Sequence, residues 1–155
     1  MVLGPRGTGR SSALRMLAEM LTTTVAAPTP AAPPVVVDDA ERVDDHDGTL
    51  ARAVESGAVS VMAAARGDAL RHRPGHWTSG VRRSRLAIVL VGGVGDATAD
   101  GELLGVSLPR RFPGAVRPGA AWLVDGSAAI PVQLALARSA DDDDHPPRPG
   151  DRSSR

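Results

Sequence analysis

Three glycines near the amino terminus stand at a spacing suited to binding phosphate. Gly4, Gly7 and Gly9 let the main chain take conformations closed to other residues, and they let backbone amides approach phosphate oxygens closely. An amphipathic segment follows at once, so the amino end of a helix would face the same place with its free N–H groups. The spacing predicts a phosphate-binding loop between a strand and a helix, Gly4-Pro5-Arg6-Gly7-Thr8-Gly9-Arg10-Ser11-Ser12.

The residues that close this P-loop indicate a nucleotide with Mg²⁺. Ser11 fills the hydroxyl position that ligates Mg²⁺ in the G-x-x-x-x-G-K-[ST] pattern, while Arg10 stands where that pattern has lysine. A guanidinium keeps the charge of lysine but is planar, larger and forked, so the exchange is not conservative at a tight site. A dinucleotide-binding loop is excluded, because G-x-G-x-x-G requires glycine at position 12, where Ser12 stands.

A pair of acids after a short apolar run supplies the second half of such a site. Val35–Val37 is a β-branched run typical of a buried parallel strand, and Asp38 and Asp39 follow it directly. P-loop enzymes place an acid at the end of an apolar strand to hold Mg²⁺. The pattern predicts Asp38 as the magnesium ligand and Asp39 as the carboxylate that orients the attacking water.

The elements needed to position these residues alternate along the chain. Leu14, Leu17, Ala18 and Leu21 recur on one face of a predicted helix over residues 11–21. A weaker helical segment covers residues 50–55, and one helical turn is expected over 101–105. Strands are predicted over 35–37, 58–65, 86–91, 121–124 and 132–136. This order predicts an α/β, three-layer P-loop fold with a mainly parallel sheet.

Composition narrows the class of protein. The chain of 155 residues carries no formal net charge and no cysteine, which excludes a disulfide scaffold and a thiolate metal site. No apolar run is long enough to span a bilayer and no signal peptide is visible, so a cytoplasmic protein is expected. One domain is predicted over residues 1–137, with a proline-rich connection at 22–34 and a disordered, charged tail at 138–155.

Five segments, in order, resemble the FtsK/SpoIIIE-type ATPase domains of actinobacteria. The resemblance spans roughly residues 2 to 137, and its motifs are Val2–Leu14, Val35–Glu41, Trp77–Arg85, Asp100–Arg111 and Arg117–Val124. It is strongest to the degenerate carboxyl-terminal ATPase module of multi-domain FtsK/SpoIIIE proteins or of EccC-like type VII secretion motors. The short interval between Leu21 and Val35 leaves little room for the further strand and helix of that family, so a truncated sheet is expected.

The resemblance implies a RecA-like fold, ATP with Mg²⁺, and assembly into a homo-oligomeric ring or with other modules of a larger parent protein. It also implies translocation of double-stranded DNA or export of a protein. The chain begins almost at the P-loop, so a fragment of a longer protein is expected. Three alternatives stay open: an ATPase module, a catalytically inactive module that binds nucleotide or serves assembly, and a decayed reading frame that folds poorly.

Other charged residues and two histidines give less specific indications of function. Arginines gather between Arg66 and Arg85, which indicates phosphate contacts to duplex DNA, a trans-acting arginine finger, or a solvated arginine-rich loop. Arg83 and Arg85 are the finger candidates. His72 and His76 have the H-x-x-x-H spacing of zinc ligands, but Pro74 and Gly75 between them break the helix that the spacing requires.

Overall fold

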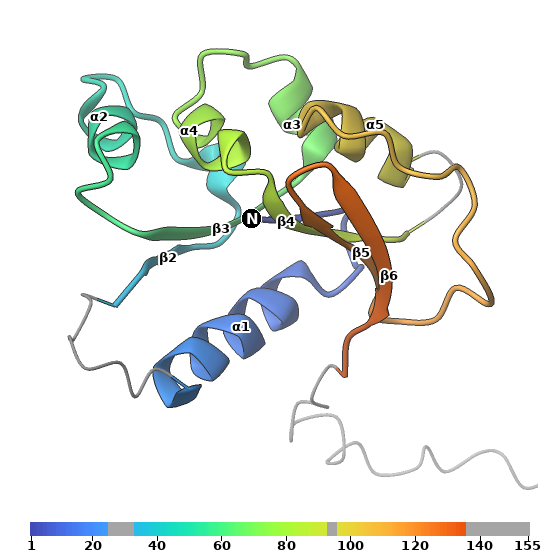
Figure 1. Ribbon diagram of the computed structural model, residues 1–155. Helices are drawn as coiled ribbons and strands as arrows, with labels where there is room; N and C mark the ends of the chain where they lie inside the picture. The colour runs from blue at the N-terminus through green and yellow to red at the C-terminus, as the bar shows by residue number, and fades with distance from the viewer. Residues whose placement is uncertain (25–32, 93–95, 136–155) are drawn as a thin grey trace, which may run out of the picture.

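Strands and helices alternate over most of the chain, in agreement with the α/β prediction. The computed structural model describes residues 1–24, 33–92 and 96–135 (Figure 1). The strands are β1 (Val2–Leu3), β2 (Val35–Val37), β3 (Val61–Ala65), β4 (Leu86–Leu90), β5 (Ala120–Asp125) and β6 (Ala128–Gln133). The helices are α1 (Arg10–Thr24), the short 3₁₀ helix η1 (Ala40–Arg42), α2 (Thr49–Glu55), α3 (Gly67–Arg71), α4 (Thr78–Arg83) and α5 (Asp96–Leu103).

The six strands form one sheet in the order β2-β3-β1-β4-β5-β6. The first four run parallel, with Val2 of β1 opposite Ala64 of β3 on one side and Ile88 of β4 on the other. β5 and β6 extend the sheet antiparallel to β4 as a hairpin. The mainly parallel sheet predicted from the sequence is therefore confirmed, with β1 at its centre and β3 separating it from β2.

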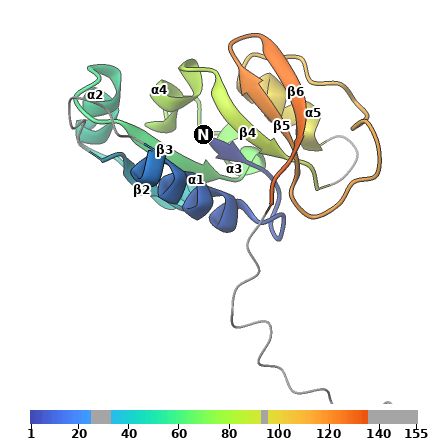
Figure 2. The ribbon, with the colours of Figure 1, turned by 60° about the horizontal axis from the view of Figure 1, so that its bottom comes forward.

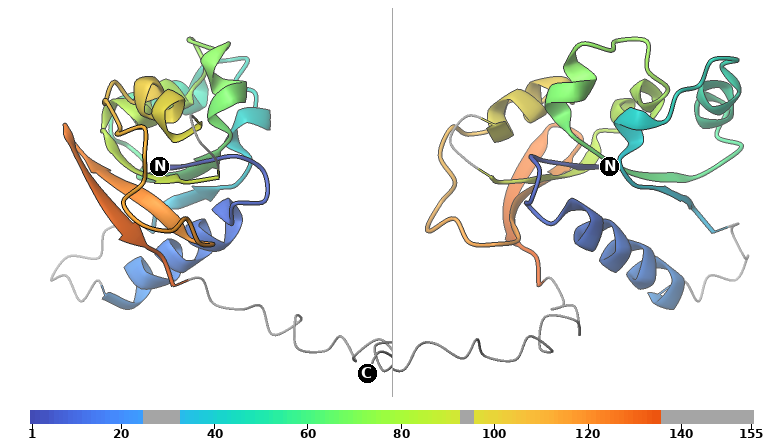
Figure 3. Two further views of the ribbon diagram at one scale, coloured as in Figure 1. Left: turned by 90° about the vertical axis from the view of Figure 1, so that its right-hand side faces the viewer. Right: turned by 180° about the vertical axis from the view of Figure 1, so that it is seen from behind.

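Helices cover both faces of the sheet and make a three-layer molecule. α1 lies alone on one face, against β1 and β3, and α2, α3, α4 and α5 lie on the other (Figures 1, 2 and 3). The pleat divides the core accordingly, because successive side chains of a strand point to opposite faces. Val2 packs with Leu14 of α1, and its neighbour Leu3 packs with Leu70 of α3 and Trp77 on the opposite face.

The boundaries of several elements differ from those expected. β2 is parallel as predicted but not buried: it is the edge strand, and Val35 and Val36 are 46% and 45% exposed. α5 begins at Asp96 rather than at position 101, and β6 begins at Ala128 rather than at 132. Residues 25–32 of the proline-rich connection and the tail predicted over 138–155 lie outside the described residues, while residues 22–24 extend α1.

The apolar face of α1 is buried over only part of its length. Ala13 and Leu14 are fully buried beneath the sheet, whereas Leu21, predicted on the same face, is 44% exposed. Within the described ranges, no helix is long and apolar enough to cross a membrane.

Candidate functional site

The P-loop predicted from the sequence is a loop between strand β1 and helix α1. Its main chain turns through Gly7 and Gly9, whose φ angles of 78° and 89° lie in the left-handed region that favours glycine. The Thr8 hydroxyl donates a hydrogen bond of 2.8 Å to the Pro5 carbonyl and closes the turn. α1 starts at Arg10, so the N–H groups of Arg10, Ser11 and Ser12, which lie outside the helical ladder, are at the loop.

Gly4 fixes the loop against the neighbouring strand. A Cβ atom at this position would stand 2.9 Å from both the Cβ of Leu90 in β4 and the Thr8 hydroxyl oxygen. Only glycine therefore lets β1 lead into the loop at this distance from β4. Gly92, which follows β4, approaches Pro5 and Thr8 in the same way, with an added Cβ 2.7 Å from the Thr8 methyl carbon.

The loop occupies the position in the sheet where α/β proteins bind ligands. From β1 the chain crosses by α1 to the strands on one side, β2 and β3, and it then returns past β1 to β4 on the other side. Crevices for ligands form outside the carboxyl ends of parallel strands where such a change of direction occurs. The P-loop follows the carboxyl end of β1 at this point.

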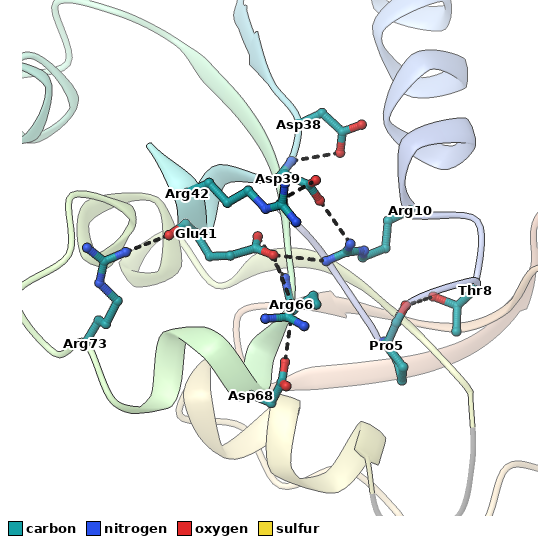
Figure 4. A network of polar contacts seen from close by, with 10 residues as sticks. All are labelled: Pro5, Thr8, Arg10, Asp38, Asp39, Glu41, Arg42, Arg66, Asp68 and Arg73. Atoms are coloured by element: carbon teal, nitrogen blue, oxygen red, sulfur yellow. Dashed lines mark hydrogen bonds and ion pairs between the residues drawn. The ribbon is translucent and has the colours of Figure 1, made fainter. Parts of the chain in front are cut away.

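Arg10 and Asp39 are brought together although 29 residues separate them. The Arg10 guanidinium donates from Nη2 to Asp39 Oδ1 over 3.1 Å, and Arg42 Nε lies 3.8 Å from the other oxygen of Asp39 (Figure 4). Asp39 has φ 45° and ψ 44° and precedes η1, so the chain turns sharply there. The P-loop cation and the second acid after β2 thus form an ion pair.

Asp38, predicted as the magnesium ligand, bonds to its neighbour in the chain. Its carboxylate accepts a hydrogen bond of 2.9 Å from the Asp39 amide (Figure 4). In the described part of the chain, no group of three or more His, Cys, Asp or Glu side chains is placed to hold a metal ion. Ser11 is exposed at the start of α1.

Glu41 and Arg66 complete this network, and the sequence interpretation gave neither a role at the phosphate site. Glu41 is only 6% exposed. Its carboxylate accepts from the Arg66 side-chain Nε over 3.2 Å and from the Arg66 amide over 3.2 Å, and it lies 3.9 Å from Arg10 Nη1. Arg66 is the first residue after β3, as Asp38 is the first after β2. This shared position, directly after adjacent parallel strands, could have indicated from the sequence that Arg66 lies near the acids that follow β2.

A second set of contacts anchors the turn that carries Glu41. Arg73 donates from Nη1 to the Glu41 carbonyl over 2.6 Å and from Nη2 to Asp44, and its hydrogen bond lowers the pKa of that carboxyl. His76 and the indole of Trp77 both contact the Val43 carbonyl, at 3.1 and 2.9 Å.

The histidine pair does not form a zinc site. His76 is 7% exposed and its other ring nitrogen contacts the Thr78 hydroxyl at 3.0 Å, whereas His72 is exposed. Burial lowers the pKa of His76, with Arg73 adding to the effect. This histidine is therefore a neutral part of the core.

A cavity of about 270 Å³ lies directly beside the P-loop at the carboxyl ends of β1 and β3. Arginine and aspartate side chains dominate its wall. Its lining consists of Gly4, Pro5, Arg6, Arg66, Gly67, Asp68, Arg71 and Asp100. Three guanidinium groups around a cavity at this edge suit an anionic ligand.

The two arginine-finger candidates lie near the amino end of β4, whereas the P-loop lies at the carboxyl ends of the parallel strands. Arg83 ends α4 and pairs with Glu55, and Arg85 immediately precedes β4, where its carbonyl accepts from the Gly126 amide over 3.0 Å. The P-loop packs instead against Leu90, at the other end of β4. Neither arginine therefore reaches the loop of its own chain, and a role in trans stays a prediction.

This chain shows little similarity to known proteins. No family model matches the chain, and no curated protein matches it. A solved structure described as the cytoplasmic domain of EssC aligns with 86% of this chain and with 32% of its own length, at 17% identity and a TM-score of 0.47. This chain thus corresponds to under half of that protein's length.

Proposed function

We propose that this chain is a nucleotide-binding P-loop module of an FtsK/SpoIIIE-like machine, with ATP as its ligand. The observation that carries the proposal is the loop itself, with left-handed Gly7 and Gly9 between central strand β1 and the amino end of α1. Such a loop presents backbone N–H groups and the positive end of a helix dipole to a phosphate. The adjacent cavity is lined by three arginines and two aspartates, so its formal charge is one positive unit, the sign that a phosphate requires.

A pair of glycine variants tests this proposal. Gly7 and Gly57 both have positive φ, 78° and 71°, and nothing lies within 4 Å of a Cβ added at either. Gly7→Val and Gly57→Val therefore impose similar backbone strain, but only Gly7→Val places a side chain at the loop proposed to bind phosphate. We expect ATP binding, measured by isothermal titration calorimetry, to be lost in Gly7→Val and kept in Gly57→Val. Equal affinities in the two variants would refute ATP binding at this loop.

A second candidate function, nucleotide binding without catalysis, is favoured by the Arg10–Asp39 contact. Asp39 would have to orient water in an ATPase, but both of its oxygens face guanidinium groups, those of Arg10 and Arg42. We expect ATP to bind without measurable turnover and Asp39→Ala to leave the phosphate-release rate unchanged. Turnover in the native chain that disappears in Asp39→Ala would instead identify an ATPase.

The wider machine is proposed from the sequence resemblance. On that basis the module assembles as a homo-oligomeric ring or with other modules of a parent protein, and the cargo is double-stranded DNA or an exported protein. In this proposal Arg83 and Arg85, which lie near the amino end of β4 and away from the P-loop, contact a neighbouring copy. Analytical ultracentrifugation with and without ATP tests assembly, and Arg83→Ala with Arg85→Ala tests the interface.

A further inference from the structure

The Asp39 carboxylate, which pairs with Arg10 of the P-loop, already faces two guanidinium groups. Asp39 receives Arg10 at 3.1 Å on one oxygen and Arg42 at 3.8 Å on the other. A magnesium site requires oxygen ligands whose negative charge is free for the ion. A guanidinium at hydrogen-bond distance occupies one such oxygen and repels a dication. The charge that Mg²⁺ would bring to this edge of the sheet is thus supplied by arginine.

The residues predicted to ligate Mg²⁺ at the loop do not make up for the loss of Asp39. One Asp38 oxygen accepts the hydrogen bond of the Asp39 amide (Figure 4). Ser11 provides a single exposed hydroxyl. Glu41 is buried and committed to the Arg66 side chain and amide. The predicted set of Ser11 and Asp38 therefore does not fit an octahedral magnesium ion at the loop.

One buried carboxylate instead positions two guanidinium groups. Glu41 Oε1 lies 3.2 Å from Arg66 Nε and 3.9 Å from Arg10 Nη1, so the two arginines flank it. Arg66 reaches the wall of the 270 Å³ cavity beside Gly4 and Arg6. Arg10 is 8% exposed, and its Nη1 has no hydrogen-bond partner. A buried donor without a hydrogen-bond partner is energetically costly, so Arg10 Nη1 favours an additional acceptor.

Guanidinium groups are suited to hold phosphate without a metal ion. Their planar fork donates two parallel hydrogen bonds to phosphate oxygens, and they stay charged at every physiological pH. Arg10 is the first residue of α1 and Arg66 directly follows β3, and they lie on either side of Glu41. Each already has a carboxylate partner, so it would hold phosphate through its remaining N–H donors.

We propose that the site binds the phosphates of its nucleotide without Mg²⁺, with Arg10 and Arg66 in place of the ion. This inference rests on the proposed function, ATP binding at the P-loop. Glu41 acts as a positioning residue that holds the two guanidinium groups at the carboxyl edge of the sheet.

The test is ATP affinity of the full chain, measured by calorimetry in excess Mg²⁺ and again in excess EDTA. We expect the two dissociation constants to agree within about threefold, a difference of under 1 kcal/mol. A rise of about tenfold or more in EDTA would overturn Mg²⁺-independence and leave ATP binding intact. Failure to bind in both conditions would overturn ATP binding and this inference together.

A matched pair of arginine variants tests the assignment of Arg66. Arg66→Gln removes the cavity-lining guanidinium, while the control Arg52→Gln removes an exposed guanidinium of α2 that donates to the Thr49 hydroxyl over 3.3 Å. In EDTA we expect Arg66→Gln to weaken ATP binding about tenfold and Arg52→Gln to leave it unchanged. Circular dichroism checks that both variants fold. Equal effects of the two variants on ATP affinity would overturn the role of Arg66. The comparison of ATP affinity in Mg²⁺ and in EDTA uses the native chain and does not depend on either variant.

Discussion

The Arg10 guanidinium lies 3.1 Å from the Asp39 carboxylate, which joins the first turn of α1 to the turn that follows β2. Strand β3 lies between β1 and β2, so this ion pair spans the end of a third strand. Arg66, which follows that third strand, enters the same network through Glu41. Three strand ends are therefore connected by charged side chains at the edge that carries the P-loop.

Glu41 is expected to contribute more to stability than an exposed glutamate in a similar pair. Glu41→Gln leaves Arg10 and Arg66 facing a neutral amide in a buried position, so we expect a loss of about 2 kcal/mol. The control, Glu55→Gln, breaks the Arg83 pair, in which the glutamate is 52% exposed, at a cost below about 0.5 kcal/mol. Urea denaturation measures both, and similar losses would show that the buried network is no stronger than a surface pair.

Gly67 is expected to tolerate no side chain, because α3 and α5 meet there. A Cβ at Gly67 would stand 1.8 Å from Asp100 Oδ1. Gly67→Ala should therefore lower the free energy of unfolding by about 2 kcal/mol, since the buried Asp100 side chain must move. Gly75→Ala, where nothing lies within 4 Å of the added atom, should change it by less than about 0.5 kcal/mol. Equal melting temperatures for the two variants would contradict this close approach.

Stability should rise with pH between about 6 and 8 because of the amino-terminal amine. The amine donates a hydrogen bond of 2.7 Å to the Leu86 carbonyl, and burial lowers the pKa of this amine from 8.0 to about 6. In that interval the unfolded chain holds a proton that the folded chain has released, so stability is lost as the pH falls. The slope should not exceed about 1.4 kcal/mol per pH unit.

Acetylation of the amine provides the control for this pH dependence. The acetylated nitrogen keeps its N–H donor but no longer titrates, so most of the slope between pH 6 and 8 should vanish. His76, whose pKa is also lowered by burial, adds destabilisation below its ordinary pKa of 6.5 in both forms of the chain. Identical slopes for the free and acetylated chains would assign the effect to other groups.

The two valine-rich strands should respond differently to the same substitution. Val36 in β2 is 45% exposed, whereas Val89 in β4 is fully buried. Val89→Thr places a hydroxyl in the core and should cost about 2 kcal/mol, while Val36→Thr should cost less than about 0.5 kcal/mol. Thermal unfolding of both variants measures this difference. A large loss in Val36→Thr would mean that β2 is covered by another segment.

The sequence was sufficient for the elements that have a strong local pattern. Leu14 and Leu17 show the helical period of α1, and the apolar run of β4 ends in Gly92. The sequence could not distinguish an edge strand from a central one, since Val35–Val37 has the composition of a buried strand. Helices α3 and α4, of five and six residues, are too short to show a period and were not predicted.

The glycines of the candidate site could be predicted, but its ion pairs could not. The turn of the P-loop depends on local backbone freedom, which Gly7 and Gly9 reveal by their type and spacing. The contacts of Arg10 and Arg66 depend on the order of strands in the sheet, and Glu41 joins them across 25 residues or more. Asp39 follows the strand that the sequence predicted, but its pairing with Arg10 required the fold.

The central place of β1 has a consequence for how the chain acquires its structure. Val2 pairs with Ala64 and Ile88, so the strand that leads into the P-loop has sheet partners that lie far along the chain. Contacts of such separation form slowly, because a long loop must close before they are made. β5 and β6, joined by a tight turn, have no such delay. During synthesis β1 precedes both strands that hold it, so the phosphate-binding turn is ordered only after Leu90 has left the ribosome.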